Sequence, residues 1–310
     1  MAIGIVFSGQ GSQKTGMGYD LYRHFPEVES FYDHLEMKHN IKDLSFFADK
    51  ETLSRTQYTQ PVLVAFQLIL LEIIKNMGVP ITWAAGVSLG EFSALVAADM
   101  ISKDDCLALI EKRGQLMSEA CQKNPSTLIA ILGQCLDNVK SMQRDLKKQS
   151  ICMEIANYNT KTQIVVGCRQ SEEQGLMDYL DGMNIAYKKL NVEGAFHTSL
   201  MDDAAIAFKK ELELIVFKEP SIDVASNYTG RLYGKDRPAA LLSNQMNHMT
   251  RFKDIIDRMK DCGIDYVLEI GHNNVIKKML EREVPEIQVI PIRCVEDLEK
   301  LKTRTFHKLA

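Results

Sequence analysis

The feature that most constrains the fold of this chain is the pentapeptide Gly86-Val87-Ser88-Leu89-Gly90, which lies between two segments of different hydrophobic pattern. The apolar run Ile81–Ala85 predicts a buried strand, and the segment Leu89–Ala98 predicts a helix. A G-x-S-x-G motif between a strand and a helix is typical of a nucleophile elbow, where flanking glycines allow a sharp turn. A glycine-rich turn with an ordinary serine is the alternative, and the strand–helix context favours the elbow.

Strands and helices alternate along most of the chain, which predicts an α/β fold with a mostly parallel sheet covered on both faces. Outside residues 123–192 the predicted strands are Ala2–Phe7, Ile81–Ala85, Asp223–Ser226, Tyr266–Ile270 and Gln288–Pro291. The predicted helices there are Gln60–Met77 with Pro61 in its first turn, Leu89–Ala98, Asp104–Ala120, Ser199–Leu214, Ala239–Met249, Arg251–Cys262 and Val275–Glu281.

Residues 123–192 follow a different order, β-α-β-β-α-β, which is typical of a ferredoxin-like unit. Its predicted strands and helices, in chain order, are Thr127–Leu132, Leu136–Lys147, Ile151–Ala156, Gln163–Gly167, Ser171–Gly182 and Ala186–Val192. We therefore expect residues 1–122 and 193–310 to form a parallel-sheet domain and residues 123–192 to form an inserted subdomain.

Composition excludes several classes of protein. The 310 residues carry 37 Lys and Arg against 41 Asp and Glu, a net charge of −4, so no nucleic-acid partner is expected. The seven cysteines are odd in number and contain no C-x-x-C pair, which predicts reduced thiols in the cytoplasm without a zinc site. The longest apolar run, Pro61–Ile74, is interrupted by Gln67 and Glu72, and the first residues lack a signal-type core, so neither a membrane span nor an export signal is expected.

A serine nucleophile needs a base, and histidine is the usual one near neutral pH. His197 lies in the small-residue loop Gly194–Ser199, between a predicted strand and a predicted helix. His248 and His272 are also plausible bases, and the sequence by itself leaves the choice open. The other histidines, which lie in polar helical segments or in the tail, are His24, His34, His39 and His307.

Two further positions have two interpretations each. The loop Gly9–Gln13 follows the first predicted strand and can offer backbone N–H groups to an oxyanion. A phosphate-binding loop is the alternative, but the G-x-G-x-x-G pattern fails because residue 14 is Lys. Arg113 fits a solvated helical charge, or a guanidinium that receives a substrate carboxylate through two parallel hydrogen bonds.

In their order along the chain, these motifs resemble the malonyl-CoA:acyl carrier protein transacylase family, and most closely the stand-alone acyltransferases of bacterial polyketide synthases. The resemblance runs from Phe7–Gln13 to Glu269–Gly271. The motifs between them are Thr59–Pro61, Gly86–Glu91, Arg113–Met117, Asn157–Asn159 and Gly194–His197. The family fold, an α/β-hydrolase-like domain with an inserted ferredoxin-like subdomain, agrees with the pattern above.

The resemblance implies a catalytic role for several residues. Ser88 would be the acylated nucleophile and His197 its base. The family holds this histidine by a main-chain carbonyl, which falls on Gln245 or Asn247 here, with Gln245 favoured. Two backbone N–H groups would form the oxyanion hole, those of Gln10 and Leu89.

The resemblance also implies an acyl pocket. Arg113 would bind the free carboxylate of a malonyl group, and Gln60 would support Arg113 and line the pocket. The other pocket residues would be Val87, Met117 and Phe196. This sequence departs from the family twice: Val87 replaces a histidine, which leaves the choice of acyl group open, and Gly271–Asn274 replaces Gly-Pro-Gly.

The implied activity is transfer of malonyl from malonyl-CoA to the phosphopantetheine thiol of an acyl carrier protein, through a ping-pong mechanism in a cytoplasmic monomer. Coenzyme A enters only as the thioester substrate, and neither a permanent cofactor nor a metal is expected. The alternatives are transfer of another acyl unit, a proofreading hydrolase acting on acyl carrier proteins, and a catalytically silent docking module. Arg113 argues against the hydrolase, because such members lack it, and intact Ser88 and His197 argue against the silent module.

Carrier proteins served by this family are generally acidic, so we expect a basic patch beside the cleft between the two subdomains. One candidate is the helix segment with Lys277, Lys278 and Arg282, since residues 278 and 282 share a face. A solvated helix face is an equally good interpretation of these charges.

Overall fold

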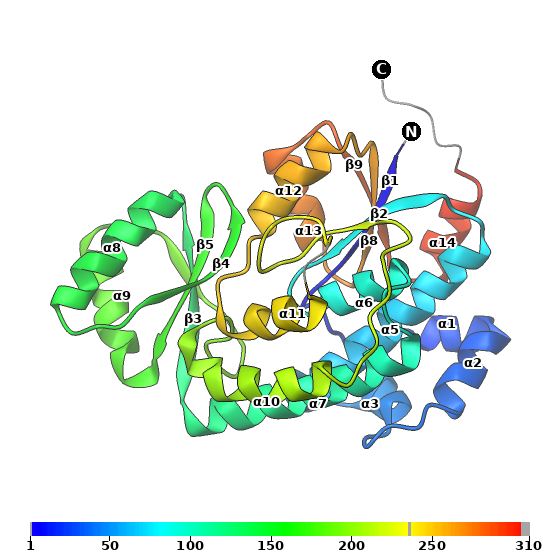
Figure 1. Cartoon of the computed structure of the whole chain (residues 1–310), viewed down its shortest axis with the longest axis horizontal. Helices are drawn as coiled ribbons and strands as arrows, with labels where there is room; N and C mark the ends of the chain where they lie inside the picture. The colour runs from blue at the N-terminus through cyan, green and yellow to red at the C-terminus, as the bar shows by residue number, and fades with distance from the viewer. Residues whose placement is uncertain (1, 235–236, 305–310) are drawn as a thin grey trace.

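The computed structural model describes residues 2–234 and 237–304, and its larger sheet has five parallel strands in the order β7-β2-β1-β8-β9 (Figure 1). These strands are β1 Ile3–Phe7, β2 Ile81–Gly86, β7 Asp223–Val224, β8 Tyr266–Ile270 and β9 Gln288–Ile292. All five residues of β1 are buried. Ile5 and Val6 belong to different hydrophobic clusters, because successive side chains point to opposite faces and both faces are covered.

The helices around this sheet lie mostly where the hydrophobic pattern predicts them. In chain order they are α1 Tyr19–His24, α2 Pro26–Asp33, α3 Ile41–Phe47, α4 Lys50–Ser54, α5 Thr56–Asn76, α6 Gly90–Ala97, α7 Lys103–Lys123, α10 Asp202–Leu212, α11 Pro238–Asn247, α12 Phe252–Asp261, α13 Val275–Glu283 and α14 Val295–Lys302. The sequence pattern gives no boundaries for α1–α4 and α14, because each is shorter than the window needed to recognise a helical period.

A second, antiparallel sheet lies apart from the first, with strand order β4-β5-β3-β6 and with helices α8 and α9 on one face (Figure 1). Its elements are β3 Ser126–Leu132, α8 Leu136–Lys148, β4 Glu154–Thr160, β5 Gln163–Arg169, α9 Glu173–Gly182 and β6 Tyr187–Lys189. This sheet has its own hydrophobic cluster, which includes Ile129, Val166 and Leu176. The predicted fold class, a parallel-sheet domain with a ferredoxin-like insertion, is confirmed.

Helix α5 begins four residues earlier than the sequence predicts, so the expectation that Pro61 lies in its first turn is wrong. The helix starts at Thr56, whose backbone N–H donates to the Glu193 carboxylate at 2.6 Å. A partner 137 residues away stabilises this first turn, which local sequence cannot indicate. By length and hydropathy α5 is the one helix in the described ranges that could cross a membrane, but 83% of its most apolar window is buried inside the protein, as in the core helix of a soluble protein.

Strand β4 is also displaced, from the predicted Ile151–Ala156 to Glu154–Thr160. The residues before it are used elsewhere: Ile151 N–H donates to Leu146 O, and Cys152 N–H donates to the Glu172 carboxylate. The pairing of β4 with β5 is irregular at two points, which blurs the alternation on which the prediction depends.

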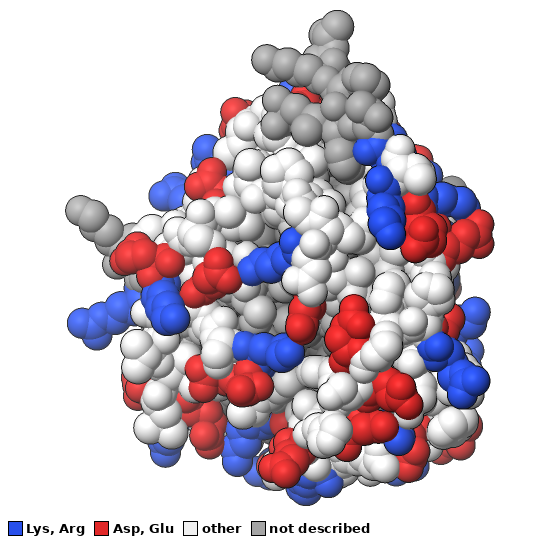
Figure 2. All heavy atoms as spheres, turned by 90° about the vertical axis from the view of Figure 1, so that its right-hand side faces the viewer, with Lys and Arg blue, Asp and Glu red and all other residues white. Residues whose placement is uncertain are grey.

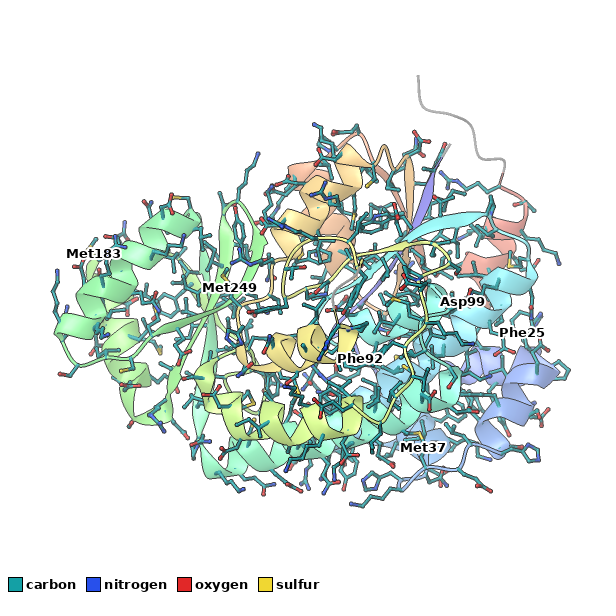
Figure 3. All side chains as sticks on the ribbon, in the orientation of Figure 1. Phe25, Met37, Phe92, Asp99, Met183 and Met249 are labelled. Atoms are coloured by element: carbon teal, nitrogen blue, oxygen red, sulfur yellow. The ribbon has the colours of Figure 1, made fainter. Side chains whose placement is uncertain are left out.

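The two sheets are joined by polar contacts as well as by the chain itself. Asn157 of β4 donates to Thr250 Oγ1 at 2.7 Å, and Lys161 N–H donates to the Glu283 carboxylate at 2.9 Å. Figure 3 places Met249 between the two parts and Phe92 inside the larger one, whereas Met183 lies at the far end of the smaller one. On the face drawn in Figure 2, basic and acidic side chains are interspersed.

Candidate active site

Ser88 lies at a strained turn between β2 and α6, at the carboxyl edge of the parallel sheet. Its φ of 50° is in the left-handed region that side chains rarely adopt. A Cβ on Gly86 would lie 1.9 Å from the Gly90 carbonyl carbon, and one on Gly90 would lie 2.2 Å from Phe7 O. Glycine is therefore required at both flanks, and this close approach exposes the serine at the turn.

Asn227, which lies just after the neighbouring strand β7, holds this turn. Its side-chain oxygen accepts the Ser88 backbone N–H at 3.0 Å, and its side-chain amide donates to Gly86 O at 2.7 Å. Its own backbone N–H donates to the Glu91 carboxylate at 3.0 Å, and Tyr233 donates its hydroxyl to the same carboxylate at 2.5 Å. Burial raises the pKa of Glu91. These contacts fix the backbone on both sides of Ser88.

His197 lies next to the serine. The Ser88 hydroxyl is 2.7 Å from His197 Nε2, and His197 Nδ1 is 2.5 Å from the main-chain oxygen of Gln245. A carbonyl only accepts, so Nδ1 carries the proton and Nε2 is left to accept from the serine. His197 has a φ of 62°, and its backbone N–H donates to Met246 O. The sequence-derived pair of Ser88 and His197 is thus in direct contact.

The ring of His197 is kept neutral by its surroundings. Burial lowers its pKa to about 4, and the charge of Arg113 adds to this effect, while the bond to Gln245 opposes it. A neutral imidazole is the form that can take a proton from serine.

Arg113 lies within hydrogen-bond reach of Ser88 and of the side chains of Gln60 and Gln245. It is 1% exposed, and it donates to Gln60 Oε1 and to Gln245 Oε1, each at 2.9 Å. Its second terminal nitrogen is also 3.4 Å from the Ser88 hydroxyl. Its Nε has no hydrogen-bond partner among the described residues, although its guanidinium lies over the Phe92 ring at 5.5 Å. Burial lowers its pKa to about 10, so it stays charged at neutral pH.

Close packing of two helices places Arg113 there. A Cβ on Gly114 would lie 3.1 Å from Thr56 O and 3.3 Å from Gln57 Cα, so α7 approaches the first turn of α5 through its glycine. This approach brings Arg113 beside Gln60. A buried guanidinium with a free N–H can bind a carboxylate.

Gln245 links the residues of the site to one another. Its main chain holds His197, its side-chain oxygen accepts from Arg113, and its side-chain amide donates to Ser88 O at 2.9 Å and to Glu91 at 2.7 Å. Asn247, the other residue considered for this role, instead donates to Asp202. We call Ser88, Glu91, Arg113, His197 and Gln245 the inner site.

The Gly-rich loop lies beside the elbow. A Cβ on Gly9 would be 2.7 Å from Val87 O, and Gln10 N–H and Leu89 N–H have no hydrogen-bond acceptor in the ranges described. Loop Gly271–Asn274, where the sequence departs from the family, braces this segment: Asn273 donates to Gly11 O, and a Cβ on Gly271 would lie 1.9 Å from Ser8 Oγ. Two free N–H groups near Ser88 are suited to an oxyanion.

The remaining sequence-predicted residues are placed as follows. Met117 is buried with its sulfur 3.4 Å from the Gln60 amide, Phe196 is buried in the main hydrophobic cluster, and Val87 is half-buried against the second cluster. Neither alternative base contacts the serine. His248 is exposed, with its Nδ1 3.1 Å from Asn244 O, and His272 stacks on Phe66. His307 lies outside the described residues.

Three contributions were not expected from the sequence: Asn227, the Glu91 carboxylate and the side chain of Gln245. Asn227 directly follows a predicted strand, and the carboxyl ends of parallel strands meet at one edge of the sheet. Its position in the sequence could therefore have indicated that it lies near Ser88. No local pattern indicates the other two. Among residues 2–234 and 237–304, no group of three or more His, Cys, Asp or Glu could hold a metal ion.

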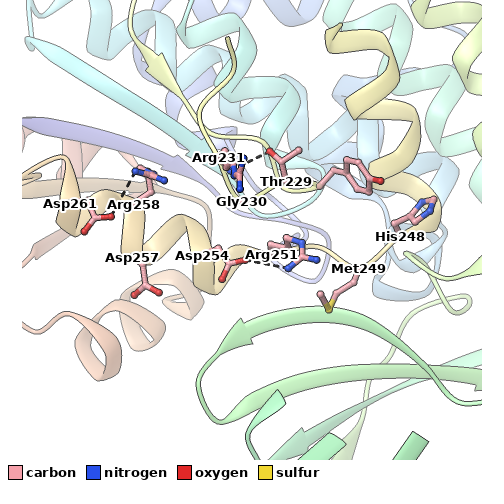
Figure 4. Close-up of a pocket in the computed structure, with 11 residues that line it drawn as sticks. Thr229, Gly230, Arg231, His248, Met249, Arg251, Asp254, Asp257, Arg258 and Asp261 are labelled. Carbon is pink, nitrogen blue, oxygen red and sulfur yellow. Dashed lines mark hydrogen bonds and ion pairs between the residues drawn. The ribbon is translucent and has the colours of Figure 1, made fainter. Parts of the chain in front are cut away.

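A cavity of about 880 Å³ contains none of the inner-site residues (Figure 4). It lies among Tyr228–Arg231, Met249 and α12. Three arginines and three aspartates line it, so their charges balance, and two of the arginines form ion pairs: Arg251 lies 3.5 Å from Asp254, and Arg258 lies 3.8 Å from Asp261. Its size therefore does not mark a site for a charged ligand.

Residues 5–305 match the family model described as the acyl transferase domain, so the chain belongs to this family of acyltransferases. It is 32% identical, over 290 residues, to the polyketide biosynthesis malonyl CoA-acyl carrier protein transacylase of Bacillus subtilis, covering 92% of this chain and 98% of that one. The crystal structure of malonyl CoA-acyl carrier protein transacylase from Clostridium perfringens superimposes with a TM-score of 0.91 at 27% identity, covering 97% and 96% of the two chains. A malonyl-transacylase solved in complex with a type II polyketide synthase acyl-carrier protein has a TM-score of 0.88 at 27% identity, covering 97% and 98%.

Proposed function

We propose that this protein is a malonyl-CoA:acyl carrier protein transacylase that works through a malonyl ester on Ser88. The observation that carries the proposal is the position of Arg113: a buried cation with a free N–H lies 3.4 Å from the candidate nucleophile. In a malonyl group a single methylene separates the carboxylate from the thioester carbonyl. It therefore reaches the guanidinium while its carbonyl lies at Ser88.

In the first half-reaction the Ser88 oxygen attacks the thioester carbon, and its proton passes to His197 Nε2. The oxyanion is stabilised by the N–H groups of Gln10 and Leu89. When the C–S bond breaks, the coenzyme A sulfur takes the proton from His197. In the second half-reaction the thiol of a carrier-protein phosphopantetheine gives its proton to His197 and attacks the ester, and Ser88 recovers the proton.

The relatives support this substrate pair, because their names specify malonyl-CoA and an acyl carrier protein. The polyketide relative favours supply of a polyketide synthase, with fatty acid synthesis as the alternative pathway. A cytoplasmic location agrees with seven free cysteines. Val87 in the elbow favours testing other acyl units that carry a carboxylate.

The test is mass spectrometry of the intact protein after incubation with a panel of acyl-CoAs, followed by addition of carrier protein. We expect a malonyl adduct on Ser88 that disappears when the carrier protein gains the same mass. Release of free malonate without transfer would favour the hydrolase, and no adduct with any thioester would contradict the proposal.

A further inference from the structure

A second cavity, of about 400 Å³, adjoins the inner site through Gln10. Three segments line it: residues 10–15 after β1, residues 50–54 in α4, and residues 188–192 at the end of β6 and just after it. We call it the outer pocket. Two of its segments lead directly into the site, since Gln10 offers the N–H group described above and the third segment continues to His197. A substrate that extends outward from Ser88 would therefore meet this pocket.

The charge of the outer pocket differs from that of the whole protein. Four lysines line it, and none of the described lining residues is acidic, although the chain has a net charge of −4. Lys189 forms an ion pair with Glu173. The other three, Lys14, Lys50 and Lys188, are exposed and have no ion-pair partner among the described residues. Unpaired lysines at one pocket provide a site for an anion with several oxygens.

The walls between these lysines and Gln10 suit a flexible substrate arm that carries both apolar and amide groups. Leu53, Leu190 and Val192 supply apolar surface, and Asn191 and Gln13 supply amide groups. A phosphopantetheine arm has the same mixture, with two amides and a dimethyl-substituted carbon, and its outer end is a phosphate ester. The larger cavity of Figure 4 lacks this combination, because three aspartates line it and two of its three arginines form ion pairs with them.

We propose that Lys14, Lys50 and Lys188 bind the phosphate ester at the outer end of the pantetheine arm, which both coenzyme A and a loaded carrier protein carry. The proposal depends on the function proposed above and adds a recognition site to it. The lysines act on binding only, because they do not touch the reacting atoms. They therefore distinguish phosphorylated from unphosphorylated thioesters.

The test uses the full-length triple variant Lys14→Glu/Lys50→Glu/Lys188→Glu, with Lys210→Glu as the matched control. Lys210 is exposed on α10 and has no ion pair in the described part of the chain. Each protein is acylated with malonyl-CoA and with malonyl-N-acetylcysteamine, a thioester without phosphate. We expect kcat/KM for malonyl-CoA to fall about tenfold or more in the triple variant at low salt, with a smaller difference at high salt. The short thioester should react equally with all three proteins.

The second half-reaction identifies the source of the phosphate. Transfer from malonyl-enzyme to holo-carrier protein is compared with transfer to free pantetheine. A loss with both malonyl-CoA and carrier protein supports a shared phosphate site, and a loss with only one assigns the pocket to that substrate. Equal losses with the short thioester, or no loss with malonyl-CoA at low salt, would overturn the proposal. If the wild type is not acylated by either thioester, the proposed function fails instead.

Discussion

In the inner site, the charged groups are buried and held by protein partners, whereas three lysines of the outer pocket are exposed and unpaired. Glu91 has three donors around it, and Arg113 has two amide acceptors. This difference separates two tasks. On the two proposals above, the buried groups select the acyl group that reacts, and the exposed groups select the carrier of that acyl group. Substitutions in the two regions should therefore differ in size, in salt dependence and in the substrate that they affect.

The largest effect is expected from Ser88→Ala. No other residue among those described lies in an elbow beside the histidine, so the variant should form no covalent malonyl-enzyme with malonyl-CoA or with the short thioester. Intact-protein mass spectrometry measures this directly. A malonyl adduct at the wild-type rate would show that the nucleophile is another residue.

The next largest effect is expected from His197→Ala. A positioned general base contributes typically about 10²–10⁴-fold, so acylation and transfer should both slow by that factor. Rapid-quench measurement of each half-reaction tests this. His248→Ala is the control, because His248 is exposed and its ring contacts Asn244 O and not the serine hydroxyl. A change below about threefold in both half-reactions would remove His197 from the mechanism.

Arg113→Ala should change selectivity by a similar order. An uncompensated buried charge costs about 3–5 kcal/mol, which corresponds to roughly 10²–10³ in the preference for malonyl over acetyl. The variant should lose malonyl transfer and gain relative activity with acetyl-CoA. Arg113→Lys should recover only part of the preference, because a point charge lacks the paired donors. An unchanged ratio of kcat/KM for the two thioesters would mean that Arg113 does not receive the carboxylate.

A smaller effect than those of the three substitutions is expected from the protonation of His197 in the inner site. Burial and Arg113 lower the pKa of His197 to about 4 from an ordinary 6.5, so the neutral base should persist well into acid. The unfolded chain binds this proton more readily, so folding stability from this group is lost as pH falls below about 6.5. NMR titration of labelled histidine, assigned with His197→Gln, measures the pKa. Arg113→Gln should raise it, and an ordinary value in the wild type would contradict the burial argument.

The smallest effect is expected outside both regions, on α13. Lys278 and Arg282 are exposed there, and Lys277 lies 3.8 Å from Glu281. Charge reversal at Lys278 and Arg282 should weaken transfer to carrier protein a few-fold at low salt without changing acylation by malonyl-CoA. This separates a protein contact from the outer pocket, where malonyl-CoA is affected as well. Unchanged transfer at low salt would show a solvated helix face.

Much of the fold follows from the sequence because its strands and longer helices have strong periodic patterns. The elements that were misplaced depend on distant partners, as the start of α5 depends on Glu193. The same distinction applies to the site. Ser88 and His197 lie in motifs that a single sequence displays, whereas Asn227 and the side chain of Gln245 act through contacts made only when the sheet and α11 assemble. Local patterns report backbone shape, and they do not report which distant side chain completes a hydrogen bond.

The several contacts of Gln245 limit how this enzyme can be redesigned. If Arg113 is replaced by a neutral residue to admit another acyl group, the side-chain oxygens of Gln60 and Gln245 lose their donor inside a dry site. Gln245 would still donate its side-chain amide to Ser88 O and to Glu91, and its main chain would still hold His197, but its side-chain oxygen would have no donor. A new acyl specificity therefore calls for coordinated substitution of all three positions, and libraries that vary them singly should yield mainly slower enzymes.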